Sequence, residues 1–194
     1  MTGQAPLDSH ADTGAATSVA LVNALALAPG AGGSITTNDG LAAIAEILAV
    51  DPPSMAQLGD GDVAGFGALA HRLHDVFADL HAGDIDAAAR RLNDMLADHP
   101  AHPHLAKEHG CWRLHHHPVE AELVPMWTSI CAESLARMIG TGYGDRLGTC
   151  ERTDCGQVFV DISRNASRRF CSTTCQNRVK AAAFRLRRVA AGHG

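Results

Sequence analysis

Four cysteines near the end of the chain restrict what this sequence can fold into. They are Cys150, Cys155, Cys171 and Cys175, two close pairs separated by fifteen residues. Each pair fits on one tight turn, and the segment between the pairs can fold back as a hairpin. Four thiolates at the corners of a tetrahedron suit zinc and leave no open position for chemistry. We therefore predict one structural Zn²⁺ held by these four side chains.

Two disulfides, or free thiols in a core, are the alternatives for this cysteine pattern. The residues around the cysteines offer few large apolar side chains. These are too few for so short a segment to fold without a cross-link such as a disulfide or a bound metal. Metal binding would therefore supply folding free energy to the module. A thiolate–metal site is also favoured over disulfides in a cytoplasmic protein.

The residues between and after the cysteines predict the local structure of the module. β-branched and aromatic residues at 157–162 indicate a strand, 163–167 a turn, and 168–170 a returning second strand. A helix over 172–190 can begin at Ser172 or Thr173 as its N-cap. Together these elements predict a treble-clef-like zinc finger in which the helix carries the last two ligands.

Residues 161–178 and 184–188 resemble the CGNR-type zinc finger of bacterial proteins. The motif Cys-Gly-Asn-Arg is present as Cys175-Gln176-Asn177-Arg178, with glutamine in place of glycine but the ligand, the asparagine and the arginine retained. That family joins the finger to an N-terminal ABATE domain and is described as regulating transcription in response to stress. The resemblance implies four cysteine ligands and DNA binding.

The remainder of the chain is expected to form a larger helical α+β domain with one β-hairpin. Leu21-Val22-Asn23 and Trp112-Arg-Leu-His115 resemble two stretches of ABATE domains. The resulting organisation is a disordered tail at 1–14, an ABATE-like domain at 15–140, a linker at 141–145 and a CGNR-type zinc finger at 146–191.

Hydrophobic periodicity predicts the elements of that larger domain. Asn38 or Asp39 is the expected N-cap of the first long helix, and Asp84 that of a later one. A short buried element is expected at 19–28, helices at 37–50, 63–80, 84–98 and 121–139, and strands at 104–109 and 111–117 that turn at Gly110.

Charge divides the chain sharply. Residues 1–145 hold 6 Lys and Arg against 18 Asp and Glu, a net charge of −12, whereas residues 146–194 hold 10 against 3, a net charge of +7. Such a basic segment fits a polyanion, and double-stranded DNA is the predicted partner. The candidate nucleic-acid-binding residues are Arg168, Arg169, Asn177, Arg178, Lys180, Arg185, Arg187 and Arg188.

Other interpretations of the basic face remain open. The face could dock an acidic protein partner, bind RNA, or be covered by the acidic N-terminal domain in a closed form. For Asn177 we weigh reading a base edge against tying down the backbone next to the cysteines, and we favour the second. A homodimer and a small-molecule effector of the N-terminal domain also stay open.

The remaining motifs predict little chemistry. His115 and His117 share a strand face without a carboxylate to complete a metal site, and the histidines at 99–109 are expected in a surface loop. Cys111 and Cys131 are expected to be small core residues. No catalytic motif is present, so an enzyme is not expected.

The first 71 residues contain no Lys or Arg, and the apolar run 19–28 is too short to cross a bilayer. We therefore expect a cytoplasmic protein without membrane contact, associated with the nucleoid when it binds DNA.

Overall fold

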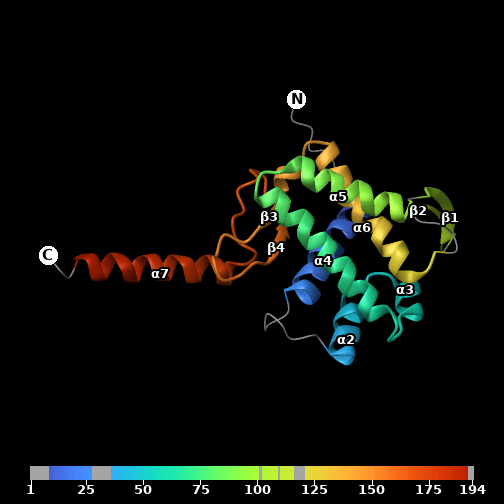
Figure 1. The fold of residues 1–194 in the computed structure, drawn as a ribbon, viewed down its shortest axis with the longest axis horizontal. Coiled ribbons are helices and arrows are strands. Elements are labelled where there is room, and N and C mark those ends of the chain that lie inside the picture. The colour runs from blue at the N-terminus through green and yellow to red at the C-terminus, as the bar shows by residue number, and fades with distance from the viewer. Residues whose placement is uncertain (1–8, 28–35, 101, 109, 116–120, 192–194) are drawn as a thin grey trace.

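The computed structural model describes residues 9–27, 36–100, 102–108, 110–115 and 121–191. Most of these residues are helical, and their strands form two small antiparallel hairpins. In Figure 1 the helices of the N-terminal region form a body, and one C-terminal helix extends away from it. The predicted mainly helical chain with small β-hairpins is confirmed at this level.

Helix α4, Asp62–His81, passes through the middle of the body (Figure 1). Its apolar residues recur every three or four positions, so Phe66, Leu73 and Phe77 lie on one side and are almost fully buried. Helix α5, Ile85–Asp98, packs against α4 and against α6, Leu123–Gly140. Burial of each such large side chain contributes about 1.5–3 kcal/mol, which makes this helix packing the main source of stability.

Helix α1 spans Ser9–Leu21 and continues as a π-helix over Val22–Ala26. Residues 9–14 therefore belong to a helix, which corrects their assignment to a disordered tail; residues 1–8 lie outside the described residues. Close packing on α6 explains the small residues here, because a Cβ on Gly14 would lie 2.1 Å from Ser134 Oγ. Leu21, Val22 and Leu25 are buried, as predicted.

Helices α2, Thr37–Leu48, and α3, Pro52–Gln57, follow one another closely. The N-cap of α2 is Thr36, whose hydroxyl accepts from the N–H of Asp39, so the prediction of Asn38 or Asp39 was wrong by two or three positions. Asp51 caps α3, a helix that the sequence analysis did not predict. Prolines fit its first turn because that turn lacks intrahelical N–H bonds.

Strands β1, His104–Glu108, and β2, Cys111–His115, form the predicted hairpin, which turns at Gly110 with a φ of +86°. Residues 109, 116 and 117, also expected in these strands, lie outside the described residues. His104 pairs with His115, and their rings stack with centroids 5.4 Å apart. Cys111 is exposed on this hairpin, so its prediction as a core residue was wrong; Cys131 on α6 is buried, as predicted.

A second hairpin joins β3, Leu147–Thr149, to β4, Val158–Val160. The predicted pairing of this strand with residues 168–170 was wrong, since those residues form no strand. The actual partner precedes the first cysteine pair, and Phe159 lies across Gly148, where an added Cβ would be 2.6 Å from the ring. A glycine in β3 thus makes room for the aromatic residue of β4.

This second hairpin packs directly on the body. Leu147 and Val158 are buried in the same core as the helices, and Tyr143 packs partly against that core. A short 3₁₀-helix, η2, Gly144–Arg146, leads from α6 into β3. The domain boundaries of the sequence analysis stay predictions, but residues on both sides of the expected linker share one core.

Candidate metal centre

The sulfur atoms of the four predicted ligands come together in the structure. Their Sγ atoms all lie within 4.8 Å of one another, and among the described residues they are the one group of metal-binding side chains of this kind. The Sγ of Cys155 lies 3.6 Å from that of Cys171 and 3.7 Å from that of Cys175, and the last two are 3.5 Å apart. These separations exceed a disulfide bond by far.

The sulfur separations fit a tetrahedral zinc ion. A Zn–S bond of about 2.3 Å in a tetrahedron places neighbouring sulfurs about 3.8 Å apart. The donor set, four thiolates on a closed site, is the set that structural zinc prefers. The four cysteines are therefore positioned to hold a single structural Zn²⁺, in agreement with the sequence prediction.

The first ligand pair lies on the turn between β3 and β4. The N–H of Cys150 donates to Gln157 O at 2.8 Å, and the N–H of Cys155 donates to Arg152 O at 2.9 Å. Gly156 follows with a φ of +69°, a left-handed conformation that favours glycine. Backbone bonds within one hairpin turn thus set the positions of both sulfurs.

The second pair lies at the start of α7, Thr173–Ala191. The Ser172 hydroxyl accepts from the N–H of Cys175 at 3.2 Å, which confirms Ser172 as a capping residue. Cys171 therefore precedes the helix and Cys175 lies in its first turn. The cap orients the helix relative to the metal centre.

The surroundings of Cys171 and Cys175 shift the pKa values of these two thiols in opposite directions. Burial, with hydrogen bonds to neighbouring sulfurs, raises the pKa of Cys171 to about 12, whereas hydrogen bonds from Ser172 and from the neighbouring thiols lower the pKa of Cys175 to about 7. Arg152 donates to the sulfur of Cys155, which raises the pKa of that arginine. Four thiolates and Zn²⁺ carry a net charge of −2, so a guanidinium beside them is electrostatically favourable.

Asp161 organises the loop that connects the two ligand pairs. Its carboxylate accepts from the N–H of Ser163 and from the N–H of Arg168, each at 2.7 Å. Burial alone would raise the pKa of Asp161, but these hydrogen bonds and the charge of Arg146 lower it overall. Asp161 therefore remains a carboxylate at neutral pH and fixes the path of the chain towards Cys171.

Arg168 and Arg169, two of the predicted nucleic-acid contacts, both have partners within the finger. Arg168 donates to the carbonyl oxygens of Val160, Phe170 and Cys171, and its guanidinium lies 4.7 Å from the centre of the Phe159 ring. Arg169 pairs with Glu151. Their contact with nucleic acid stays a prediction, but Arg168 also ties the loop before Cys171 to β4.

The other predicted contacts lie on α7, and all are exposed. Among the described residues, none of the five basic side chains of α7 forms an ion pair, and the amide of Asn177 makes no hydrogen bond. The alternative in which Asn177 ties down the backbone thus finds no support here. These candidate side chains are Asn177, Arg178, Lys180, Arg185, Arg187 and Arg188.

Sequence reasoning missed a polar contact that joins the finger to the body. The side-chain amide of Asn23, in the π-helix that follows α1, donates to Val158 O at 3.0 Å and accepts from Val158 N–H at 2.9 Å. One side chain thereby satisfies both backbone groups on the outer edge of β4, as an added strand would. In the sequence, only the position of Asn23 in the motif Leu21-Val22-Asn23 could have indicated this contact.

The C-terminal region is thus a four-cysteine zinc finger, built from a hairpin turn and the start of a helix. Residues 146–188 match the model of the CGNR zinc finger family. No curated protein matches the chain. The ABATE-like nature of the N-terminal region stays a prediction.

No helix among the described residues is both long and apolar enough to cross a bilayer.

Proposed function

We propose that the protein binds double-stranded DNA through α7 and acts as a transcription regulator, with the zinc finger holding that helix on the body. This proposal rests on the position of α7 and on the exposure of its basic side chains. The helix extends away from the body (Figure 1), and its basic side chains are exposed without ion pairs among the described residues. A helix that is open on several sides can enter a major groove.

The arrangement of basic residues around α7 supports a duplex as the partner. Helical geometry places Arg178 and Arg185 on one side and Lys180 and Arg187 nearly opposite, since seven residues make about two turns. A helix in a major groove faces the backbones of both strands, so cations on two sides both find phosphates. An acidic protein surface would meet chiefly one side.

The zinc ion has no chemical step in this proposal. Four thiolates leave no open coordination position, so Zn²⁺ would stabilise the finger and fix the start of α7. A link to stress, an effector of the N-terminal region, a homodimer and the location in the cell are further predictions from the sequence.

Salt-dependent binding of the zinc-loaded chain to a randomised duplex pool tests the proposal. If about four phosphates are neutralised, the logarithm of affinity should fall against the logarithm of salt with a slope of about −3.6. Replacing both Arg185 and Arg188 by Ala should flatten that slope by about two units and leave the zinc content unchanged.

Arg137→Ala is the matched control, because it removes an ion-paired cation from α6 instead of α7. The wild-type slope should persist in this variant. Absence of duplex binding at about 50 mM salt, where the phosphate contribution is strong, would contradict DNA binding. Binding of an acidic protein in that case would instead support the interaction-module alternative.

A further inference from the structure

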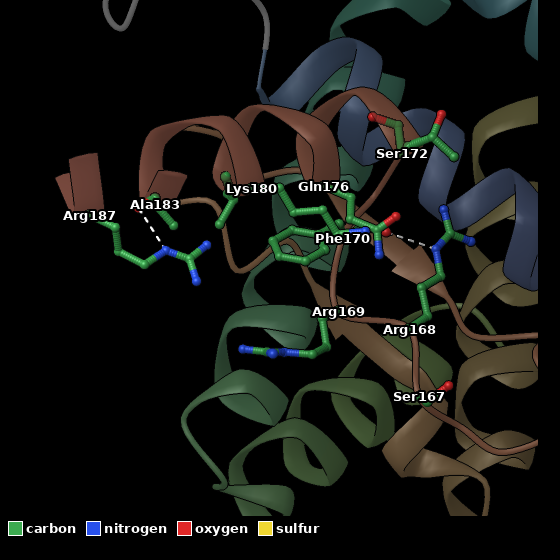
Figure 2. Close-up of a pocket in the computed structure, with 11 residues that line it drawn as sticks. Ser167, Arg168, Arg169, Phe170, Ser172, Gln176, Lys180, Ala183 and Arg187 are labelled. Carbon is green, nitrogen blue, oxygen red and sulfur yellow. Dashed lines mark hydrogen bonds between the residues drawn. The ribbon is translucent and has the colours of Figure 1, made fainter. Parts of the chain in front are cut away.

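A groove of about 560 Å³ lies between the loop 167–170 and one side of α7 (Figure 2). Gln176, Lys180, Ala183 and Arg187 are spaced by three or four residues, so they share the side of α7 that forms one wall. The loop forms the other wall. The lining residues are Ser167, Arg168, Arg169, Phe170, Ser172, Thr173, Gln176, Val179, Lys180, Ala183 and Arg187.

The groove is positively charged. Lys180 and Arg187 line it from α7, and neither has an ion-pair partner among the described residues. Arg169 lies on the opposite wall, and Figure 2 shows its side chain and that of Arg187 extending towards one another in this view. Glu151, the partner of Arg169, does not line the groove, and no other carboxylate of the described residues does so. An anion would therefore meet two cations of α7 without ion pairs, and on the other wall Arg169, whose charge is shared with Glu151.

Its remaining surface is part apolar and part hydrogen-bonding. Phe170, Val179 and Ala183 give an apolar strip, and the Phe170 ring lies beside α7 in Figure 2. Hydroxyl and amide groups come from Ser167, Thr173 and Gln176. A sugar–phosphate chain has the matching composition, because its phosphates are anionic and its deoxyribose carbons present an apolar face.

We propose that this groove seats the sugar–phosphate backbone of one DNA strand. The inference rests on the proposed function and deepens it, since it assigns Lys180, Arg187 and Arg169 to the backbone of one strand. The zinc–thiolate centre carries a net charge of −2, so the phosphate should lie towards Lys180 and Arg187, away from Cys171 and Cys175. Arg178 and Arg185 then face the other strand or the bases.

Binding of a sugar–phosphate backbone in the groove is tested directly by titrating the zinc-loaded full chain with thymidylyl-thymidine, a dinucleotide with one phosphodiester. Backbone amide signals of residues 167–187 are followed by NMR at low salt. We expect saturable shifts at the groove residues. Thymidine, which lacks phosphate, should produce none, and inorganic phosphate should produce weaker ones, because it lacks the sugars that cover the apolar strip.

Two double variants measure separately what each side of α7 contributes to dinucleotide binding. Lys180→Ala with Arg187→Ala should weaken dinucleotide binding roughly five-fold, the loss expected for exposed ion pairs. Arg178→Ala with Arg185→Ala removes the same charge from the other side and should leave dinucleotide affinity unchanged. Alanine is the best helix former, so both variants should keep α7 helical.

The outcomes distinguish this inference from the proposed function. The wild-type chain could bind duplex DNA while the amide signals of the groove residues do not shift in the titration. That result would contradict backbone binding in the groove and leave the proposed DNA-binding function standing. Equal losses in the two double variants, or equal shifts with inorganic phosphate, would also contradict backbone binding in the groove. Binding of the dinucleotide in the groove without binding of duplex DNA would support the groove as a site for a sugar–phosphate backbone. It would contradict the proposed function, which is duplex binding.

Discussion

Three arginines of the body differ from the basic residues of α7 in having ion-pair partners. In the body, Arg72 pairs with Asp98, Arg91 with Asp75 and Asp79, and Arg137 with Glu133. The basic residues of α7 form no such pairs among the described residues. Exposed ion pairs contribute little stability, so pairing in the body mainly cancels charge. Under the proposed function, the cations of α7 are the ones that would contact phosphates.

The two regions also differ in what holds them together. The body buries side chains from several helices in one continuous core. The finger contributes Leu147 and Val158 to that same core, while the segment from Asp161 onwards relies on polar contacts and on the cysteines. Loss of the metal should therefore affect the finger far more than the body.

Removing two zinc ligands should have the largest effect. We expect Cys171→Ser with Cys175→Ser to abolish zinc binding and to unfold the start of α7, because metal binding supplies folding free energy to such modules. Elemental analysis should give about one zinc per wild-type chain and none for the variant. NMR signals of the body should persist.

Treatment of the wild-type chain with a chelator provides the control, since it removes the ion without changing a residue. Its spectrum should match that of the double variant. Full zinc occupancy in the double variant would contradict the assignment of the ligands.

Asn23→Ala should have the next largest effect, at the contact between the regions. It leaves the N–H and the carbonyl of Val158, a buried residue, without their side-chain partner. An unsatisfied buried group costs about 1–3 kcal/mol, so the free energy of unfolding should fall by roughly 2 kcal/mol in chemical denaturation. Zinc content should not change.

Asn177→Ala is the matched control for that measurement, because it removes an exposed asparagine that makes no hydrogen bond among the described residues. Its stability should not fall below that of the wild type, because Ala is a better helix former than Asn. Equal stability of Asn23→Ala would mean that the finger and the body do not depend on this contact.

Asp161→Asn should lower stability by about 1–2 kcal/mol at neutral pH, since it weakens two short hydrogen bonds in the loop before Cys171. The pKa of Asp161 is lowered in the folded protein. Its contribution is therefore full above the unfolded value of about 3.9 and is lost as pH falls through the folded value. Denaturation curves of both proteins should converge only in that acidic range.

The smallest effect concerns the two cysteines outside the metal centre. Burial raises the pKa of Cys131 to about 12, whereas Cys111 is exposed. An alkylating reagent at pH 8 should therefore modify Cys111 quickly and Cys131 only on unfolding, because the thiolate is the reactive form. Mass spectrometry of peptides identifies the site, and Cys111→Ser should abolish the fast reaction.

Spacing and periodicity were sufficient to predict the metal ligands and most helices. The pattern of Cys150, Cys155, Cys171 and Cys175 is local, and α4 and α5 follow from apolar residues at helical spacing with Asp84 as a cap. These features depend on short stretches of chain. They are therefore readable without knowledge of tertiary contacts.

The errors came from contacts between distant segments. Small residues near Gly14 suggested a tail because their packing partner, Ser134, lies on α6. Residues 168–170 suggested a strand, but β3 occupies the position beside β4, and Arg168 reaches Val160 through its side chain instead. The contact of Asn23 with Val158 spans 135 positions, beyond any local pattern.

Asn23 contacts the hairpin of the finger where the finger meets the body, so this contact would influence the angle at which α7 leaves the body. Helix α7 has 19 residues and is therefore about 28 Å long at 1.5 Å per residue. A tilt of about 10° at the hairpin would move the far end of such a helix by about 5 Å. This displacement exceeds the rise of one base pair, about 3.4 Å. The register of α7 on a duplex would thus depend on one side-chain amide of the body, that of Asn23.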